Sequence, residues 1–298
     1  MPNSISNIDW HIAGLGSIAA LSNAFGLRHD LNMQPIVREN SQSFCTHFVD
    51  LNNDKHVLSS PTSLGNISTI NKLLVPLKSY DVVPFLAEVT KKLAPNAQVV
   101  LCHNGMGTID KALSLLPSSA NLYFCTTNNG VFKQDRVAHY AGAGDSFWQL
   151  VKQGNQNKLT TNSINQILPN AIESNDLEKL LWQKLIVNCA INPLTAIHQV
   201  KNGQLAKANF QPIINDIVKE AVLVANAEGI DITFVDMLNK VHTVITQTSE
   251  NNSSMFQDVL HKRETEIEFI TGYLLESATN HNLKLKTNLD IYQQVKTL

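Results

Sequence analysis

The chain has 298 residues, of which 43% are hydrophobic and 16% charged, with 13 glycines and 10 prolines. This composition excludes a collagen-like or disordered chain, and the length favours two domains, because single cores stop growing at about 250 to 300 residues. The formal net charge of -2 gives no electrostatic support for nucleic-acid binding, which needs a basic face.

The cysteines are far apart in the sequence, form no CxxC pair and have apolar neighbours, so we expect free core thiols rather than disulfides or a zinc site. The ten histidines include no HxH or HExxH pair, and we expect no metal. The first basic residue is Arg28 and no apolar run reaches the roughly 20 residues that span a bilayer, so we expect a cytoplasmic protein with no membrane segment. We expect a monomer or a homodimer.

Up to about residue 150, short apolar runs alternate with helical patterns, which is typical of a sheet with crossover helices. The expected strands cover residues 8–12, 35–38, 73–77, 99–102 and 122–125. The expected helices cover 20–27 and 82–93, and the second of them has Pro84 in its first turn. The strand over 8–12 is more polar than the buried central strand of such a sheet usually is.

The second half of the chain has helical patterns. Residues 154–165 form a polar connection, and strand patterns almost disappear after Ser174. The expected helices cover about 175–199, 205–229, 233–248 and 254–281. We therefore predict an α/β, Rossmann-like domain over 1–175 and an all-α domain over 176–298.

A glycine-rich segment follows the first expected strand and opens a helix. It consists of Gly14, Leu15, Gly16, Ser17, Ile18 and Ala19. In the pattern GxGxxA the glycines allow a tight turn and the close approach of a pyrophosphate to the helix N-terminus. Arg38 ends the second strand and suits the 2′-phosphate of NADP, although Glu39 beside it is the residue type that NAD prefers. The alternative is a tight turn that binds nothing.

A second motif, His103-Asn104-Gly105-Met106-Gly107, follows the strand over 99–102 at the sheet edge where α/β proteins bind ligands. The glycines allow a close backbone approach, and Asn104 offers both a donor and an acceptor. Lys78 ends the strand over 73–77 at the same edge and could meet a phosphate. A plain turn and a solvated lysine are the alternatives.

The third motif is a polar row on an otherwise apolar helix. Lys184, Asn188 and Asn192 recur at every fourth position, so they share one face. Burying an ammonium and two amides without partners is costly, so the row should face a ligand, unless it is a solvated stripe. Pro193 favours a bend or a helix end at Asn192. Desolvation lowers the pKa of a lysine, which would make Lys184 a suitable proton donor.

The fourth motif lies in the last expected helix. Ser254 stands near its start, where free N–H groups favour a carboxylate, although simple capping explains a serine equally well. Glu266 follows twelve residues later, and composition alone does not choose it over Glu264 or Glu268.

Taken in order, these motifs resemble the ketopantoate reductase family over about residues 10–280. The matching blocks are GLGSIA at 14–19, HNGMGTID at 103–110, LWQKLIVNCAINPLTAI at 181–197, SSMFQD at 253–258 and TEIEFITGYLL at 265–275. The resemblance implies an NADP-dependent oxidoreductase that uses NADPH to reduce 2-dehydropantoate to (R)-pantoate in pantothenate and coenzyme A biosynthesis.

The resemblance also implies roles for individual residues. Lys184 would donate the proton and Glu266 would bind substrate and support that acid. The substrate would be held by Asn104, Asn188, Asn192 and Ser254. The cofactor would be bound by Gly14, Leu15, Gly16, Ser17, Ile18, Ala19, Arg38, Lys78 and Asn104, with its nicotinamide facing a cleft walled by the helix of Lys184.

Two departures and two rival functions accompany this reading. Ala19 replaces a third glycine, and residues 126–129 replace a segment in which relatives often have a histidine. The rivals are a reductase of another small oxo acid and a catalytically silent NADP-binding sensor.

Overall fold

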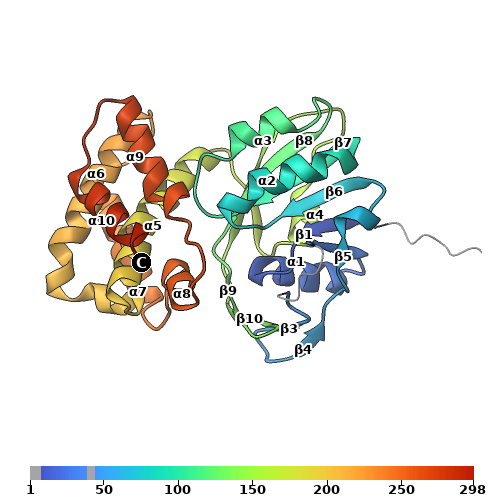
Figure 1. Cartoon of the computed structure of the whole chain (residues 1–298), viewed down its shortest axis with the longest axis horizontal. Helices are drawn as coiled ribbons and strands as arrows, with labels where there is room; N and C mark the ends of the chain where they lie inside the picture. The colour runs from blue at the N-terminus through green and yellow to red at the C-terminus, as the bar shows by residue number, and fades with distance from the viewer. Residues whose placement is uncertain (1–7, 39–43) are drawn as a thin grey trace, which may run out of the picture. The chain divides into compact units, whose positions relative to one another are not determined.

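The computed structural model describes residues 8–38 and 44–298, and the chain divides into two compact units (Figure 1). Unit 1 comprises residues up to 103 together with 108–175, and unit 2 comprises 104–107 and 176–298. Unit 1 is an α/β structure and unit 2 contains helices and no strand, which confirms the predicted fold class. The loop 104–107, which we had placed in the first domain, packs with the helices of unit 2.

The main sheet of unit 1 has eight strands in the order β12-β11-β8-β7-β6-β1-β2-β5. Every neighbouring pair is parallel except β8 and β11, which are antiparallel. All five expected strands lie in this sheet. The bounds are β1 (Trp10–Ala13), β2 (Met33–Val37), β5 (Thr62–Ser63), β6 (Ile70–Val75), β7 (Leu93–Cys102), β8 (Asn121–Thr127), β11 (Ser146–Lys152) and β12 (Ala171–Glu173).

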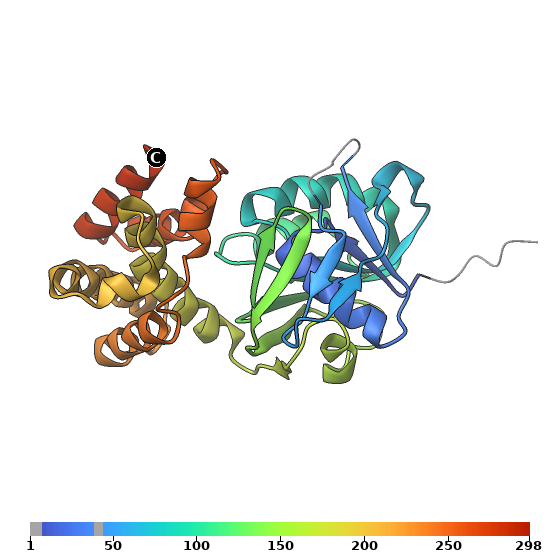
Figure 2. The same cartoon turned by 90° about the horizontal axis from the view of Figure 1, so that it is seen from below.

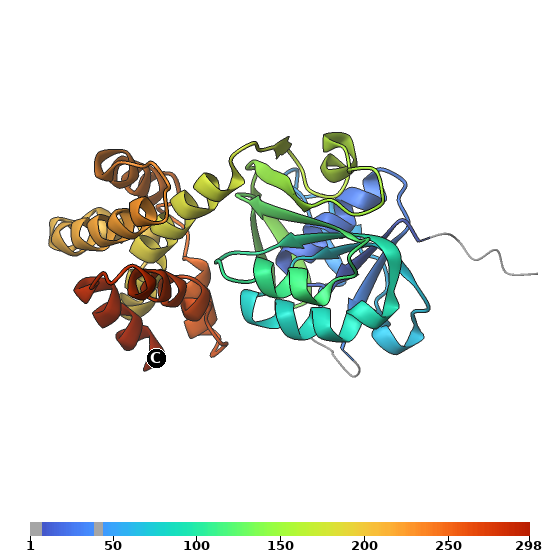
Figure 3. The ribbon, with the colours of Figure 1, turned by 90° about the horizontal axis from the view of Figure 1, so that it is seen from above.

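The strand order fixes where the helices lie. From β1 the chain steps to β2 on one side, whereas β6, β7 and β8 follow on the other side. Because crossovers are right-handed, α1 (Ser17–Arg28) lies on the opposite face from α2 (Ser79–Val89) and α3 (Ile109–Leu115). Figure 3 shows α2 and α3 side by side. The carboxyl ends of β1 and β6 are therefore the switch point at which such sheets bind ligands.

The first strand is buried in spite of its polar composition. Trp10, His11, Ile12 and Ala13 are all buried, and β1 pairs with both β2 and β6. Burial lowers the pKa of His11, which favours the neutral imidazole. The Lys72 amine lies 5.6 Å from the centre of the Trp10 ring, a cation–π contact. The polar residues of β1 are therefore compatible with its central position in the sheet.

A second, four-stranded sheet covers α1, and our sequence analysis did not predict it. Its order is β4-β3-β10-β9, with bounds β3 (His47–Val49), β4 (Lys55–Val57), β9 (Gly130–Gln134) and β10 (Val137–Gly142). Leu21 and Ala24 of α1 share a buried cluster with Phe48 of β3 and Ala138 of β10. Figure 2 shows these strands in front of α1. The second sheet therefore buries the outer face of the helix that follows the glycine-rich turn.

A carboxylate ties this second sheet to the end of α1. Asp50, just after β3, forms an ion pair with Arg28 of α1 and hydrogen bonds with His56 and with the backbone N–H groups of Asn52 and Asp54. The hydrogen bond with His56 is the strongest of the effects that lower the pKa of Asp50 to about 2, although burial acts the other way.

This carboxylate gives a prediction for acid stability. A carboxyl whose folded pKa is depressed stabilises the fold above its unfolded pKa of about 4, and that contribution is lost as the pH falls towards 2. Urea midpoints measured from pH 5 to pH 2.5 should therefore fall more steeply for the wild type than for Asp50→Asn. Asp54→Asn, which removes an exposed carboxylate from the same turn, should behave as the wild type does. Parallel curves for all three proteins would contradict this role.

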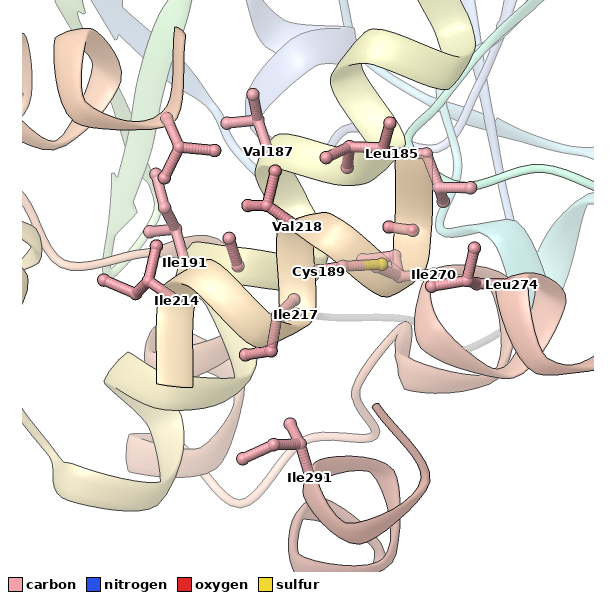
Figure 4. Close-up of a cluster of buried hydrophobic side chains, with 14 of the residues drawn as sticks. Leu185, Val187, Cys189, Ile191, Ile214, Ile217, Val218, Ile270, Leu274 and Ile291 are labelled. Carbon is pink, nitrogen blue, oxygen red and sulfur yellow. The ribbon is translucent and has the colours of Figure 1, made fainter. Parts of the chain in front are cut away.

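In unit 2 the helix α5 lies at the centre of one hydrophobic core. The helices are α5 (Leu177–His198), α6 (Gln211–Ala227), α7 (Phe234–Gln247), α8 (Ser254–Leu260), α9 (Thr271–Asn280) and α10 (Lys286–Lys296). Their apolar side chains form a single buried cluster. Figure 4 labels Leu185, Val187, Cys189 and Ile191 of α5 among Ile214, Ile217, Val218, Ile270, Leu274 and Ile291.

Two of the expected helices have different bounds in the structure. The prediction of one continuous helix over 254–281 is wrong, because α8 ends at Leu260 and Lys262 adopts a left-handed φ of 53°. A short 3-10 turn, η5 (Ile267–Phe269), then precedes α9. The helix expected from 205 begins only at Gln211, after the 3-10 turns η3 (Asn202–Ala206) and η4 (Ala208–Phe210). A further helix, α10, follows beyond residue 281.

The two prolines considered in the sequence are both inside helices. The helix end predicted as one alternative at Asn192 is wrong, because α5 continues through Pro193 to His198. The Thr195 hydroxyl lies 2.9 Å from the carbonyl oxygens of both Ile191 and Asn192 and stabilises this turn. Pro84 is not in a first turn either, since α2 begins at Ser79.

Candidate cofactor and substrate sites

The glycine-rich turn lies at the switch point of the main sheet. Gly14 has a φ of 74°, and a Cβ added there would lie 3.3 Å from Cδ2 of Leu77, in the segment that follows β6. The Gly14 N–H donates to the carbonyl of Ile36 at the end of β2, at 2.7 Å. Only glycine adopts this conformation readily at so close an approach, so Gly14 holds together the ends of three neighbouring strands.

The N-terminus of α1 is suited to an anion. Gly16 is its N-cap and offers no side chain, and the first turn contains no acidic residue. The first helical hydrogen bond is from the Ala20 N–H to the Gly16 carbonyl, at 2.9 Å, so the helix's own carbonyls do not use the preceding N–H groups. A Cβ added at Gly16 would meet nothing within 4 Å, so the backbone there is open. These features fit a pyrophosphate.

Arg38 and Lys78 are brought to the same edge by the first turn of α2. The Arg38 guanidinium forms an ion pair with Asp81 at 2.6 Å, and the Asp81 N–H donates to the Lys78 carbonyl at 2.9 Å. Lys78 does not end a strand as expected, because β6 stops at Val75 and Lys78 is the N-cap of α2. Glu39, which we weighed against Arg38, lies outside the described residues.

The loop after β7 is attached to the turn that contains Glu266. The Met106 N–H donates to the carbonyl of Phe269 at 2.9 Å, and the Phe269 N–H donates to the carbonyl of Glu266 at 3.0 Å. Gly105 has a φ of 77°, and a Cβ added there would lie 2.6 Å from the Phe269 carbonyl oxygen. The structure therefore brings the loop of Asn104 to the segment of Glu266.

The polar row of α5 lies on a helix that is otherwise buried over 185–196. Lys184 and Asn188 are half-buried, and Asn192 is buried, with 6% of its surface exposed. Successive members rise by about 6 Å along the helix, so the row is continuous. We had predicted that the helix is buried, and this is confirmed; the roles of the three side chains stay a prediction.

Two polar contacts connect α5 with the other segments of the candidate site. The Thr195 hydroxyl donates to the hydroxyl of Ser253 at 2.7 Å, at the start of α8. The hydroxyl of Thr271, the first residue of α9, lies 3.9 Å from the sulfur of Cys189 in α5. Burial raises the pKa of Cys189 to about 12, so this thiol stays protonated and is not a nucleophile.

The structure separates the two serines at the start of α8. Ser253 is the N-cap: it is buried, and its hydroxyl accepts from the Phe256 N–H at 3.0 Å. Ser254 is exposed and is the first residue of the helix. Capping therefore accounts for Ser253 and does not account for Ser254.

Of the three nearby glutamates, only Glu266 is buried, with 4% of its surface exposed. Glu264 is exposed, and Glu268 binds the hydroxyl of Tyr292 at 2.7 Å and the amine of Lys296 at 2.5 Å. Burial raises the pKa of Glu268, but these two partners lower it overall, so this carboxylate stays ionised and tied to α10. Burial thus distinguishes Glu266 from its two neighbours, and its role stays a prediction.

The segment 126–129 has a structural role. Asn129 is buried, and its amide oxygen accepts from the hydroxyl of Tyr140 and from the Gly144 N–H at 3.0 Å. Its amide nitrogen donates to Thr127 at 2.8 Å. Asn129 therefore joins β8 of the main sheet to β10 of the second sheet. Sequence analysis had no means to assign this network, and it also overlooked Asp81, an acid three residues after Lys78.

Two further observations concern only the described part of the chain. In residues 8–38 and 44–298, no cluster of three or more His, Cys, Asp or Glu side chains is arranged to bind a metal ion. Over the same ranges, no helix has both the length and the apolar character needed to span a membrane.

The close packing at Gly105 gives a prediction for stability. Gly105→Ala would combine a positive φ with an overlap against the Phe269 carbonyl, so we expect a loss of roughly 2–4 kcal/mol in the free energy of unfolding. Gly229→Ala is the matched control, because Gly229 has a φ of 85° but open space around it, and its loss should be only about 1 kcal/mol. Urea unfolding of both variants measures the difference, and equal losses would contradict this packing.

A glycine-rich turn at the switch point of a largely parallel sheet is typical of dinucleotide-binding domains. Residues 10–153 match the family model described as ketopantoate reductase PanE/ApbA, and residues 176–298 match the model of its C-terminal part. The chain therefore belongs to the ketopantoate reductase family.

Individual relatives agree with this family. The 2-dehydropantoate 2-reductase of Vibrio cholerae is 36% identical over 238 residues, which cover 79% of this chain and 80% of that protein. The protein of the same name from Yersinia pestis is 30% identical over 263 residues, which cover 88% of this chain and 81% of that protein.

Solved structures share the fold at lower identity. A PanE/ApbA family ketopantoate reductase from Ralstonia eutropha has a TM-score of 0.86 at 20% identity, covering 97% of each chain. D-mandelate dehydrogenase in complex with NADH and anilino(oxo)acetate has a TM-score of 0.87 at 17% identity, again covering 97% of each chain. At these identities the likeness concerns the fold.

Proposed function

We propose that this chain is a 2-dehydropantoate 2-reductase that uses NADPH to form (R)-pantoate for pantothenate and coenzyme A biosynthesis. The observation that carries the proposal is the row of Lys184, Asn188 and Asn192 on the buried helix α5, in a chain whose curated relatives have this name. Residues 1–175 serve as the NADP-binding domain and residues 176–298 as the substrate and catalytic domain.

The residues of unit 1 fit the cofactor. The open backbone at Gly16 and the first N–H groups of α1 suit its pyrophosphate, and Gly14 keeps the turn tight. Arg38 and Lys78, which the first turn of α2 connects, suit the 2′-phosphate and the adjacent groups. Leu15, Ser17, Ile18 and Ala19 complete the turn, and Asn104 serves both cofactor and substrate. NADPH supplies the hydride when it is bound.

The residues of unit 2 hold and orient a small oxo acid. Ser254 is in the first turn of α8 but is not its N-cap, so its hydroxyl is not used for capping. It binds the substrate carboxylate together with the N–H groups of the helix N-terminus. Asn188 and Asn192 offer amide donors and acceptors for the hydroxyl and carboxylate of the substrate.

Lys184 acts as the proton donor. As hydride adds to the keto carbon, the carbonyl oxygen gains negative charge and accepts a proton from Lys184 Nζ, so a C–H and an O–H bond form while the C=O π bond is lost. A positioned cation stabilises that developing charge most strongly where water is excluded. Glu266, buried in the turn that contacts the loop of Asn104, binds the substrate and supports Lys184 as the acid.

We also propose that the protein acts in the cytoplasm, as a monomer or a homodimer. The free, buried state of Cys45, Cys102, Cys125 and Cys189 supports a reducing compartment.

Replacing the donor gives a direct prediction. Lys184→Ala should lower kcat by roughly 100-fold or more with 2-dehydropantoate and NADPH, because both the proton and the charge that stabilises the developing alkoxide are lost. Lys179→Ala removes a lysine from the same helix and should leave kcat within about twofold. A Lys184→Ala enzyme with near-normal kcat would rule out this role.

The two neighbouring glutamates allow a matched comparison. Glu266→Gln keeps the shape of the side chain but removes its charge, and we expect kcat/KM to fall roughly 100-fold. Glu268→Gln weakens the contact with Tyr292 and Lys296 but should keep kcat/KM within about threefold. If the two variants lose equal activity, the assignment of Glu266 fails.

A further inference from the structure

An acid lies beside the arginine that the proposed function assigns to the 2′-phosphate. The Asp81 carboxylate and the Arg38 guanidinium are 2.6 Å apart. The side chain of Asp81 is 33% exposed and that of Arg38 is 78% exposed. Asp81 is in the first turn of α2, where the helix dipole favours a negative charge. The acid therefore lies beside Arg38 at a position that the helix dipole favours.

This arrangement affects two kinds of nucleotide in opposite ways. A 2′-phosphate, which carries up to two negative charges, is repelled by the carboxylate and must share the guanidinium with it. A ribose 2′-hydroxyl can instead donate a hydrogen bond to such a carboxylate, as it does to the acid of NAD-binding proteins. Since exposed ion pairs contribute little stability, the guanidinium can exchange its partner at low cost.

We propose that Asp81 is a specificity-determining residue that weakens the preference of this chain for 2′-phosphorylated nucleotides and lets it accept nucleotides with a free 2′-hydroxyl. The inference rests on the proposed function, because it takes Arg38 and Lys78 as the basic residues at the 2′ position. Asp81 acts by holding Arg38 and by its own charge.

The test measures nucleotide binding directly. Isothermal titration of the full-length protein with 2′,5′-ADP and with ADP gives two Kd values for the wild type, Asp81→Asn, Arg38→Ala and Glu88→Gln. Glu88 is the matched control, because it is an exposed acid in the last turn of the same helix, roughly 10 Å along the axis from Asp81.

We expect Asp81→Asn to bind 2′,5′-ADP about three- to tenfold more tightly than the wild type does. Its affinity for ADP should stay within about twofold of the wild-type value or decrease. The gain should shrink as salt is added, because the charges are exposed. Glu88→Gln should match the wild type for both nucleotides. The ratio of kcat/KM for NADPH to that for NADH should rise in Asp81→Asn alone.

The outcomes separate this inference from the proposed function. If Arg38→Ala loses affinity for 2′,5′-ADP but Asp81→Asn leaves the ratio of the two Kd values within twofold, the role of Asp81 is overturned and the cofactor assignment stands. An equal gain in Glu88→Gln would overturn it as well, since any loss of negative charge would then suffice. If Arg38→Ala changes neither Kd, both the assignment of Arg38 and the inference fall.

Discussion

The constraint on which the rest depends is the cost of placing polar groups on a buried helix. Helix α5 packs against α6, α7, α8 and α10 and is mostly buried over 185–196, and yet the half-buried Lys184 and Asn188 and the buried Asn192 recur along one face. A lysine and two amides so placed are unfavourable for a core and favourable for a polar ligand. This cost explains why a helix at the centre of unit 2 is also the best candidate for binding and protonating a substrate.

A single turn organises the remaining groups of unit 2. In the segment from Glu266 to Phe269, the carboxylate of Glu266 is buried and the carboxylate of Glu268 binds Lys296 of α10. The carbonyl of Phe269 accepts a hydrogen bond from the N–H of Met106. The last contact attaches the loop 104–107, which follows a strand of the main sheet, to the helical unit. The positive φ of Gly105 allows that approach. The loop that contains Asn104 and the turn that contains Glu266 are thus in contact although they are far apart in the chain.

Much of this was predictable where local patterns reflect burial. The glycine-rich turn, five of the eight strands of the main sheet and the apolar character of α5 follow from local sequence patterns, whereas β5, β11 and β12 were not predicted. The second sheet does not follow from such patterns, because β3 and β4 have only three residues each and β10, the second partner of β3, is distant in sequence. The break after α8 depends on a left-handed Lys262, which no propensity indicates. The burial of Glu266 and the pairing of Asp81 with Arg38 both depend on tertiary contacts that the sequence does not reveal.

The central claim is that this member of the ketopantoate reductase family transfers hydride to a 2-oxo acid and a proton from its own lysine. The most direct measurement follows the absorbance of the reduced nicotinamide when 2-dehydropantoate is added to the enzyme with NADPH, together with a chiral assay of the product. The account predicts that one NADPH is oxidised for each (R)-pantoate formed. Tight binding of NADPH without any oxidation in the presence of 2-dehydropantoate would contradict it.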